Sequence, residues 1–501
     1  MAVIINNTSG SAGGGGSFSY PVGDATITFS KFVKSAGAVA LQWTDPDDVI
    51  FEGVTLASWT KTVVVRKQGS PSTDPSDGTV VFQETIRDAY NDTPLYDSNV
   101  SYDITYYYTL YTQSDNGAWS DGVSTAGITP KASQVMTVRI DTTNSNPETA
   151  LTYMDDATSM TAGSEAWDEW FGCYPVILAQ GGTEFGVLDK NDYTKFEDGT
   201  SASNYLANTG YDVMTAFPCM GVKIWTSGNY TYVSMTDDTD AESDGYTYYA
   251  HTKGTTKKDK FYLGAYDAYN SSSKLYSHSG KTPTVSITLT NARNYATARG
   301  TGYQLMAFYQ WTFLQCLFIL KYKSLNCQTA LGRGYVDKTS SGSAVQTGLT
   351  NAKGFNYGLT TSGTNTTNNR VKFLGIEDCW GNIYQWLDGC YSNSSRHLLT
   401  TQTNSGWSDS GSGYVDSGTM GSISGAYMSK ALGTSDGGFA PVTASGSETT
   451  YYADYCYVNA GRCVYVGGVW DDAGYAGVFC FYANIPASVS YSNLGCRICY
   501  L

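Results

Sequence analysis

Short runs of alternating hydrophobic and polar residues fill the chain from about residue 24 to residue 131. Turn residues such as Asp45 with Pro46 and Asn116 with Gly117 separate runs that include DATITFSKF, AVALQWTD, TKTVVVRKQ and SYDITYYYTLYTQ. Several strands at this spacing indicate a small β-sandwich. The stretch from Ile128 to Lys131, ITPK, is typical of a linker and ends this region.

A second block begins with VMTVRIDTT at Val135, and its hydrophobic pattern mixes two periods. Runs such as GVKIWTS and YTYVSMTDD predict strands. Apolar residues at helical spacing predict a helix from about Leu305 to Lys323, and a shorter helix is expected near Asn291 to Arg299. The apolar positions of the longer helix, which we expect in the core, are Trp311, Leu314, Phe318 and Tyr322.

Composition and charge narrow the class of protein. The chain has 501 residues, which predicts two or three domains, and it is rich in Gly (54) and Tyr (41). A net charge of −15 argues against nucleic acid as a partner, because phosphates need a basic surface. No apolar run approaches the ~20 residues that span a bilayer, so no membrane insertion is expected.

The N-terminal residues 1–22 are rich in Gly and Ser and predict a flexible arm. They lack the basic start and the apolar run of a signal peptide, so none is expected. The 11 cysteines are an odd number, and reduced thiols are the expectation. Cys496 and Cys499 form one CxxC, but no His lies near a Cys pair, so a metal or redox site is not expected there.

The segment Gly375 to Gly389, GIEDCWGNIYQWLDG, combines aromatic residues with acceptors. Gly381 and Asn382 predict a turn or bulge. The carboxylates of Glu377, Asp378 and Asp388 would suit a structural calcium ion, which prefers clustered oxygen ligands. The alternative, which we favour, is that Asn382 and Asp388 hydrogen-bond loop backbone beneath a binding surface.

Residues 454–501 have an unusual composition. They contain no Lys, Glu, Gln or Met and are crowded with Tyr, Cys, Val, Ser, Gly and Asn. Gly-Gly, Ala-Gly and Gly-Cys-Arg steps give the stretch a fixed pattern, while the intervening residues look interchangeable. Tyr gives large contact area at low entropy cost, and Asn and Ser give adaptable hydrogen bonds. The pattern therefore indicates a rigid frame that carries a binding surface.

Three motifs in order, WGNIYQWLDG, VGGVW and NLGCR, resemble the C-type lectin fold in its formylglycine-generating-enzyme branch. The resemblance covers residues 132–501 and implies an α+β C-type lectin domain with the two helices above. The LQW run around Trp43 and the tyrosine-rich run Tyr102 to Tyr111 resemble a fibronectin type III domain. That likeness implies an all-β, Ig-like sandwich at residues 23–131, serving as a spacer.

Within this branch, the C-terminus looks most like the variable proteins of diversity-generating retroelements, which end in GGxWxxGxxAGxF, a Ser and GxR. Ala473 stands where that pattern has Gly. Mutagenesis at adenines of AAC-type codons cannot produce Met, Lys, Glu, Gln or Trp. The first four are the residue types missing from 454–501, and the Trp that occurs there, Trp470, is a frame residue. The matching frame residues are Gly467, Gly468, Trp470, Ala476, Gly477, Phe479, Ser488, Gly495 and Arg497.

The resemblance implies a variable region at about 456–493 whose side chains lie on the surface and bind the ligand. For Phe481 and Ile485 the alternative, that the side chain packs in the core, weighs most. The implied variable positions are Tyr457, Arg462, Tyr465, Val469, Asp471, Asp472, Tyr475, Phe481, Tyr482, Asn484, Ile485, Val489 and Tyr491.

Enzymatic activity is not expected. The sulfatase-modifying relatives use a paired-cysteine copper site soon after the GGS-aromatic motif, and the matching stretch Gly467 to Ala476 contains no Cys. The related iron oxygenases use three His from a further domain, and that motif is missing. Asp471 and Asp472 are adjacent and would point to opposite faces of a strand. No cofactor is expected beyond the calcium alternative.

The resemblance implies a phage receptor-binding protein of the tail fibre or tail tip, located in the virion tail and acting at the host cell surface. The partners would be a host surface protein or glycan, and phage tail proteins through the N-terminal region. A homotrimer would suit a fibre tip. The alternatives are a bacterial surface adhesin with the same fold, or a formylglycine-generating-type oxidoreductase.

Overall fold

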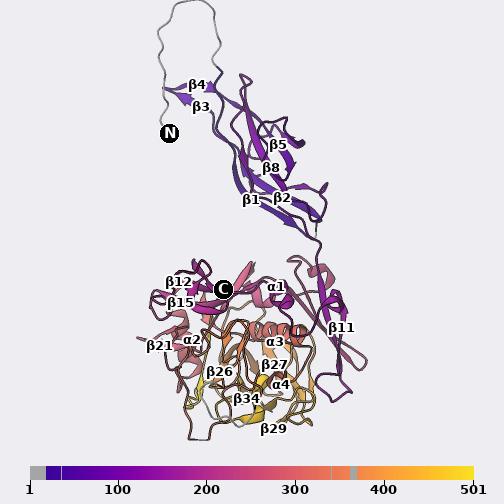
Figure 1. The fold of residues 1–501 in the computed structure, drawn as a ribbon, viewed down its shortest axis with the longest axis vertical. Coiled ribbons are helices and arrows are strands. Elements are labelled where there is room, and N and C mark those ends of the chain that lie inside the picture. Colours follow the sequence, from indigo (N-terminus) through magenta and orange to yellow (C-terminus); the bar gives the residue numbers. More distant parts are fainter. Residues whose placement is uncertain (1–18, 35, 340, 362–368) are drawn as a thin grey trace, which may run out of the picture. The chain divides into compact units, whose positions relative to one another are not determined.

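The chain divides into two compact units, Met1–Ser133 and Gln134–Leu501 (Figure 1). The computed structural model describes residues 19–34, 36–339, 341–361 and 369–501. Most of the expected N-terminal arm, residues 1–22, therefore lies outside the described residues. The division at Ser133 falls close to the predicted linker, which ends at Lys131.

The first unit consists of two antiparallel sheets and a small hairpin. One sheet has the order β1 (Thr26–Val33), β2 (Ala38–Thr44) and β7 (Leu95–Asp97). The other has the order β6 (Thr79–Glu84), β5 (Trp59–Gln68), β8 (Tyr106–Ser114) and β9 (Val123–Ser124). The hairpin pairs β3 (Val49–Phe51) with β4 (Val54–Ala57).

The two sheets share one core, which makes the first unit a β-sandwich. Trp43 from β2 and Tyr108 from β8 are both 0% exposed and belong to the same cluster. The hydroxyl of Tyr106 accepts a hydrogen bond of 3.1 Å from the N–H of Ser101, the tyrosine corner of Ig-like sandwiches. The alternation of the sequence thus predicts the sandwich correctly, and its assignment to the fibronectin type III family stays a prediction.

The second unit contains three larger sheets. A four-stranded sheet has the order β11 (Leu151–Asp155), β10 (Val135–Asp141), β17 (Tyr230–Thr236) and β16 (Gly221–Ser227). A seven-stranded sheet has the order β14 (Asp192–Phe196), β13 (Glu184–Asp189), β12 (Tyr174–Ala179), β15 (Tyr211–Pro218), β20 (Lys260–Gly264), β36 (Ile498–Tyr500) and β23 (Tyr303–Leu305).

The third sheet holds most of the predicted variable region. Its order is β28 (Val415–Thr419), β27 (His397–Thr400), β26 (Tyr384–Ser392), β33 (Arg462–Gly467), β34 (Gly477–Ile485), β32 (Tyr455–Val458) and β29 (Ile423–Tyr427), with β35 (Leu494–Gly495) beside β26. Strand β34 runs antiparallel to β33 and parallel to β32. The predicted variable region therefore supplies central strands of this sheet, and the residues that follow it, in β36, belong to the seven-stranded sheet.

Helix α3 (Phe308–Tyr322) lies in the middle of the second unit (Figure 1). Every residue of α3 except Tyr322 is buried, as expected for a helix that is apolar on all sides. Helix α2 (Leu289–Thr297) begins after Thr288, whose hydroxyl accepts the N–H of Asn291. Both helices lie where the sequence predicts them; α1 (Ala166–Phe171) and α4 (Cys327–Ala330) are short.

Candidate ligand-binding surface

A tight glycine turn follows β33 and sets the geometry of the predicted binding segment. Gly467 and Gly468 have φ values of 90° and 84°, a region that glycine adopts without a steric penalty. A Cβ on Gly468 would lie 2.4 Å from the Cβ of Ala476. Trp470, only 5% exposed, packs with Ile383 beneath the turn. The Gly-Gly-x-Trp pattern thus fixes a loop on the core.

The first residue of β34 is equally constrained. A Cβ on Gly477 would lie 2.1 Å from Oδ1 of Asp454, which is buried. The other carboxylate oxygen of Asp454 accepts the N–H of Phe479 at 2.7 Å. Burial raises the pKa of Asp454 well above its usual value. Asp454 and Gly477 together hold the start of β34 against the chain that enters β32.

Arg497 anchors the other end of the segment. Its side chain is 1% exposed and pairs with Asp267 at 2.7 Å. It also donates to Oε1 of Gln385 at 3.0 Å and to the carbonyls of Glu377 and Asp378 at 2.9 and 3.1 Å. A buried guanidinium with this many acceptors positions several loops at once. The terminal Gly-x-Arg motif is therefore a scaffold element.

The carboxylates of the 375–389 segment are occupied by arginines. Arg370 donates from Nε to Asp378 at 2.6 Å and from Nη2 to Glu377 at 3.2 Å. Arg293 donates twice to Asp388, at 2.8 and 2.9 Å. Across the described ranges, no group of three or more His, Cys, Asp or Glu is placed to hold a metal ion.

Asn382 supports a neighbouring loop, as favoured from the sequence. Its φ is 61° and that of Gly381 is 80°, so the predicted turn is present. The Asn382 side-chain oxygen accepts the N–H of Val345 at 2.9 Å. Asp388 accepts the N–H of Gly389 at 2.8 Å. Calcium as a structural ion stays an untested alternative.

The cysteines of the CxxC motif lie in the core rather than at a reactive surface. Cys496 and Cys499 are both 0% exposed, and burial raises the pKa of each thiol. No disulfide joins cysteines in the parts of the chain that the structure describes. Buried thiols with raised pKa values are poor nucleophiles.

Neighbouring strands of the third sheet each place a tyrosine on the same side. The inner rings are Tyr384 on β26, Tyr465 on β33 and Tyr482 on β34. Tyr465 and Tyr482 stack with centroids 5.1 Å apart, and the edge of Tyr384 meets Tyr465 at 4.9 Å. Cross-strand aromatic pairs of this kind stabilise a sheet. These three rings form a rigid floor.

The outer rings continue the row toward solvent. Tyr455 on β32 lies 6.3 Å from Tyr482 and stacks on Tyr475 of the short helix η4 (Ala473–Tyr475) at 4.2 Å. Tyr427 on β29 meets both Tyr455 and Tyr475 at 5.4 Å. Tyr475 is 40% exposed. We call Tyr427, Tyr455 and Tyr475 the outer tyrosine group.

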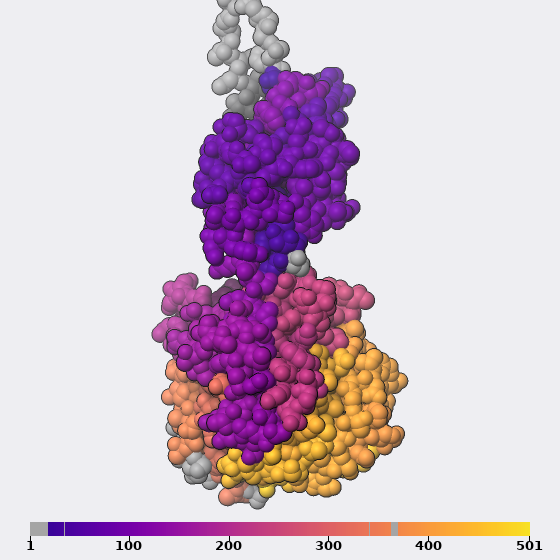
Figure 2. Space-filling model, turned by 90° about the vertical axis from the view of Figure 1, so that its right-hand side faces the viewer, coloured from indigo at the N-terminus to yellow at the C-terminus, as the bar shows by residue number. Residues whose placement is uncertain are grey.

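The thirteen predicted binding residues divide by exposure, and Figure 2 shows that part of the C-terminal segment, in yellow, reaches the surface. Asp471, Tyr475 and Tyr491 are exposed, Tyr491 by 53%. Half-buried positions are Tyr457, Arg462, Asp472, Asn484 and Val489. Buried positions are Tyr465, Val469, Phe481, Tyr482 and Ile485. Which of them bind ligand stays a prediction.

The expectation that all thirteen lie on the surface is wrong for the five buried residues. Strand β34 is covered on both faces, because Phe481 packs in one core cluster and Tyr482 in another. Ile485 belongs to the second cluster with Tyr465. Val469 packs beneath the glycine turn beside Trp470. A central strand between two cores has no solvent face to diversify.

Asp471 and Asp472 lie in a turn, so the expectation that two adjacent acids on a strand point to opposite faces does not apply to them. Asp472 precedes η4, and its carboxylate accepts the N–H of Val469 at 3.0 Å. Burial raises the pKa of Asp472 to about 6, while a hydrogen bond from Tyr384 opposes the shift. Asp471 is exposed beside it. One carboxylate therefore supports the turn and the other faces solvent.

Two residues of the outer surface lie outside the predicted variable region. Tyr427 and Glu448 reach the segment through long-range packing: a Cβ on Gly474 would lie 2.5 Å from Oε2 of Glu448 and 3.4 Å from the hydroxyl of Tyr427. Glu448 is exposed. No local motif marks either residue, because the pairing of β29 with β32 brings Tyr427 close and a loop brings Glu448 to Gly474.

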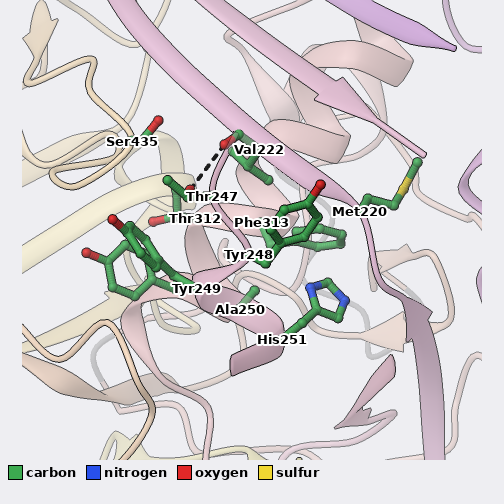
Figure 3. Close-up of a pocket in the computed structure, with 11 residues that line it drawn as sticks. Met220, Val222, Thr247, Tyr248, Tyr249, Ala250, His251, Thr312, Phe313 and Ser435 are labelled. Carbon is green, nitrogen blue, oxygen red and sulfur yellow. Dashed lines mark hydrogen bonds between the residues drawn. The ribbon is translucent and has the colours of Figure 1, made fainter. Parts of the chain in front are cut away.

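A separate cavity near α3 is too small to be the site. Its volume is about 10 Å³, and Tyr248, His251 and Phe313 line it (Figure 3). That space is about what one water molecule needs. Burial lowers the pKa of His251 to about 4, and Nε2 lies 3.3 Å from the carbonyl of Phe217. This histidine is a neutral core residue at ordinary pH.

The described residues contain no helix with the length and apolar character needed to cross a membrane. The chain matches no protein-family model and no curated protein sequence.

The solved structures that are similar to this chain include the following three. PvdO from Pseudomonas aeruginosa has 11% identity and a TM-score of 0.26, over 58% of this chain and 94% of that one. Treponema denticola variable protein 1 has 9% identity and a TM-score of 0.26, over 58% and 97%. The Major Tropism Determinant U1 variant has 12% identity and a TM-score of 0.23, over 68% and 73%. Likeness at these values supports no statement about activity.

Proposed function

We propose that this chain is a non-enzymatic receptor-binding protein whose second unit, a C-type lectin-like domain, displays a diversified surface to a bacterial cell. The observation that carries the proposal is the division of residues 454–501 into two populations. Glycines with no room for a Cβ and the buried Arg497 hold the backbone, whereas Asp471, Tyr475 and Tyr491 are exposed between them.

The chemistry of the surface supports recognition rather than catalysis. Tyrosines on a rigid sheet supply large contact area with little loss of conformational freedom. The carboxylates of the 375–389 segment and Asp267 are paired with Arg293, Arg370 and Arg497, of which the last two are buried. The buried cysteines have raised pKa values. These groups serve the scaffold, in keeping with a binding role in the virion tail.

Binding of the labelled full chain to a panel of bacterial strains, measured by flow cytometry, tests the proposal. We expect strains that bind the wild type to bind the double variant Tyr475→Ala, Tyr491→Ala at least about tenfold more weakly, because exposed aromatic anchors dominate interfaces. Both side chains are well exposed, so circular dichroism and thermal unfolding should not change.

The matched control replaces two equally exposed tyrosines of the first unit, Tyr96 and Tyr102, which are 51% and 53% exposed. Wild-type binding by the Tyr475/Tyr491 variant, equal loss by the control, or no binding to any strain would each contradict the proposal.

The coding DNA distinguishes a diversified phage protein from a fixed adhesin. For a diversified protein, we expect a neighbouring near-copy of the stretch encoding residues 454–501 that differs only at adenines.

A further inference from the structure

Three carboxylates, those of Glu448, Asp471 and Asp472, belong to the turn that carries Tyr475 or lie beside it. None of the ion pairs in the described ranges involves Glu448, Asp471 or Asp472. Lys338 contacts this loop through its backbone, whose N–H donates to the carbonyl of Trp470 at 2.7 Å.

Aromatic rings elsewhere in the chain are commonly covered by its own cations. Lys372 lies 3.5 Å from the ring centre of Tyr193, and Arg299 lies 3.9 Å from that of Tyr276. In the described part of the chain, none of these cation–π contacts involves Tyr427, Tyr455 or Tyr475. The outer tyrosine group is thus aromatic, partly exposed and without an internal cation.

The carboxylate of Glu448 lies beside this group. A Cβ on Gly474 would lie 2.5 Å from Oε2 of Glu448 and 3.4 Å from the hydroxyl of Tyr427, so both flank the same backbone position. Glu448 also contributes to the raised pKa of Tyr427, after burial itself, through the charge of its carboxylate. Asp471 and Asp472 lie at the start of the same turn. Stacked tyrosine rings and a carboxylate therefore converge on one spot.

We propose that this spot binds a guanidinium or ammonium group, and that the partner is an Arg- or Lys-bearing segment of a host surface protein. A cation gains from the faces of tyrosine rings and from an adjacent carboxylate at the same time. The net charge of −15 favours a basic partner and disfavours acidic polysaccharides. The inference rests on the proposed function and names the class of its ligand.

Recognition would then depend on residues outside the variable region. Tyr427 and Glu448 precede residue 454 and belong to the part of the chain that the retroelement pattern leaves constant. They would give every variant a preference for cationic groups, while Tyr475, Asp471 and their neighbours adjust the fit. This surface is therefore a constant cation-preferring edge beside a changeable face.

A fluorescein-labelled Arg-Gly-Ser repeat peptide, and the same peptide with neutral citrulline in place of Arg, test the inference on the full chain. Fluorescence polarisation should show the Arg peptide binding at least about tenfold more tightly, with affinity falling as salt rises. The double variant Glu448→Gln, Asp471→Asn should remove most of this preference. Glu197→Gln, an exposed acid after β14 in another sheet, should not.

Gly474→Ala tests the same carboxylate without a change of charge. The added methyl would displace the carboxylate of Glu448 from its position beside the tyrosines. Gly474→Ala should therefore weaken binding of the Arg peptide, as the double variant Glu448→Gln, Asp471→Asn does. Equal binding of the Arg and citrulline peptides, no binding of either, or undiminished preference in the neutral variants would overturn the inference.

Cell binding separates failure of the inference from failure of the proposed function. If the Tyr475/Tyr491 variant loses cell binding while Glu448→Gln, Asp471→Asn keeps it, the surface binds a host ligand of another class, such as a neutral glycan, and only the inference fails. If neither variant changes cell binding, both fail. Loss in both, with the peptide preference above, supports both.

Discussion

Tyr465 and Tyr482 face each other across β33 and β34, with ring centroids 5.1 Å and ring planes 16° apart. Both are positions that the sequence pattern assigns to the interchangeable set, yet they are only 6% and 8% exposed. The stack therefore supports the surface instead of forming it. Packing therefore restricts substitution at Tyr465 and Tyr482 more than at the exposed Tyr475 and Tyr491.

Replacing Tyr482 should cost stability, and replacing Tyr491 should not. Tyr482→Ala leaves a cavity beside Tyr384 and Tyr465, so the free energy of unfolding should fall by about 3 kcal/mol or more. Tyr491→Ala, at a side chain 53% exposed, should change it by less than about 0.5 kcal/mol. Urea unfolding followed by fluorescence measures both; equal costs would contradict the division.

Ala473 should accept glycine with a gain in stability. The frame pattern has Gly here, and Ala473 keeps the left-handed backbone, with φ of 50°. Relief of that strain, offset by the entropy of the added glycine, predicts that Ala473→Gly stabilises by up to about 1 kcal/mol. Ala476→Gly, where the Cβ packs on Gly468, should destabilise instead. Differential scanning calorimetry measures the melting temperature of both variants. A lower melting temperature for Ala473→Gly than for the wild type would show that the backbone of Ala473 is not strained.

Gly477 should tolerate no side chain. In Gly477→Ala the Cβ would lie 2.1 Å from the buried carboxylate of Asp454, and overpacking of this kind costs about 1–3 kcal/mol or more. The variant should unfold at lower urea concentration or fail to accumulate. Gly210→Ala is the matched control, since its nearest neighbour would lie 3.4 Å away. Equal stability of the two variants would count against the close contact.

Asp472 should make the protein less stable as the pH rises from about 4 to about 6. Burial raises the folded-state pKa of Asp472 from 3.8 to about 6. The folded state therefore holds this proton longer than the unfolded state, and ionisation above pH 6 works against folding. Asp472→Asn keeps an acceptor for the N–H of Val469 and should be more stable than wild type by about 1 kcal/mol or more at pH 7.

The advantage of Asp472→Asn should shrink through pH 4 and vanish near pH 3, where the wild-type carboxyl is protonated in both states. Urea unfolding at a series of pH values gives the difference directly. Asp471→Asn, at the exposed neighbour, provides the control for removing one charge. A pH-independent difference for Asp472→Asn would show that burial of this carboxyl does not govern the effect.

Glycine spacing and aromatic periodicity predict the frame well, because close contacts leave a specific mark on sequence. Gly468 and Gly477 have no room for a Cβ, and the apolar positions of α3 recur at helical spacing. The pattern fails for Phe481 and Tyr482, since β34 is covered on both faces and its register with β33 shifts. Alternation then carries no information about exposure.

The sequence does not predict that Tyr427 and Glu448 belong to this surface, and the reason differs from that for β34. They join the surface through the pairing of β29 with β32 and through a loop that meets Gly474, contacts set by the fold of the whole second unit. No local spacing encodes them. The first unit shows the converse: Trp43 and Tyr108 lie in strands whose alternation is plain, and both are core residues.

Strand β36 lies between β20 and β23, so residues that follow the variable region complete a sheet begun some three hundred residues earlier in the chain. A stop codon or frameshift within that region would remove β36 and Arg497 together. Such a copy would lack the strand that joins β23 to β20 and the guanidinium at the centre of a buried polar network. The end of the chain would thus control the whole second unit: under the proposed function, only full-length, in-frame copies could present the binding surface.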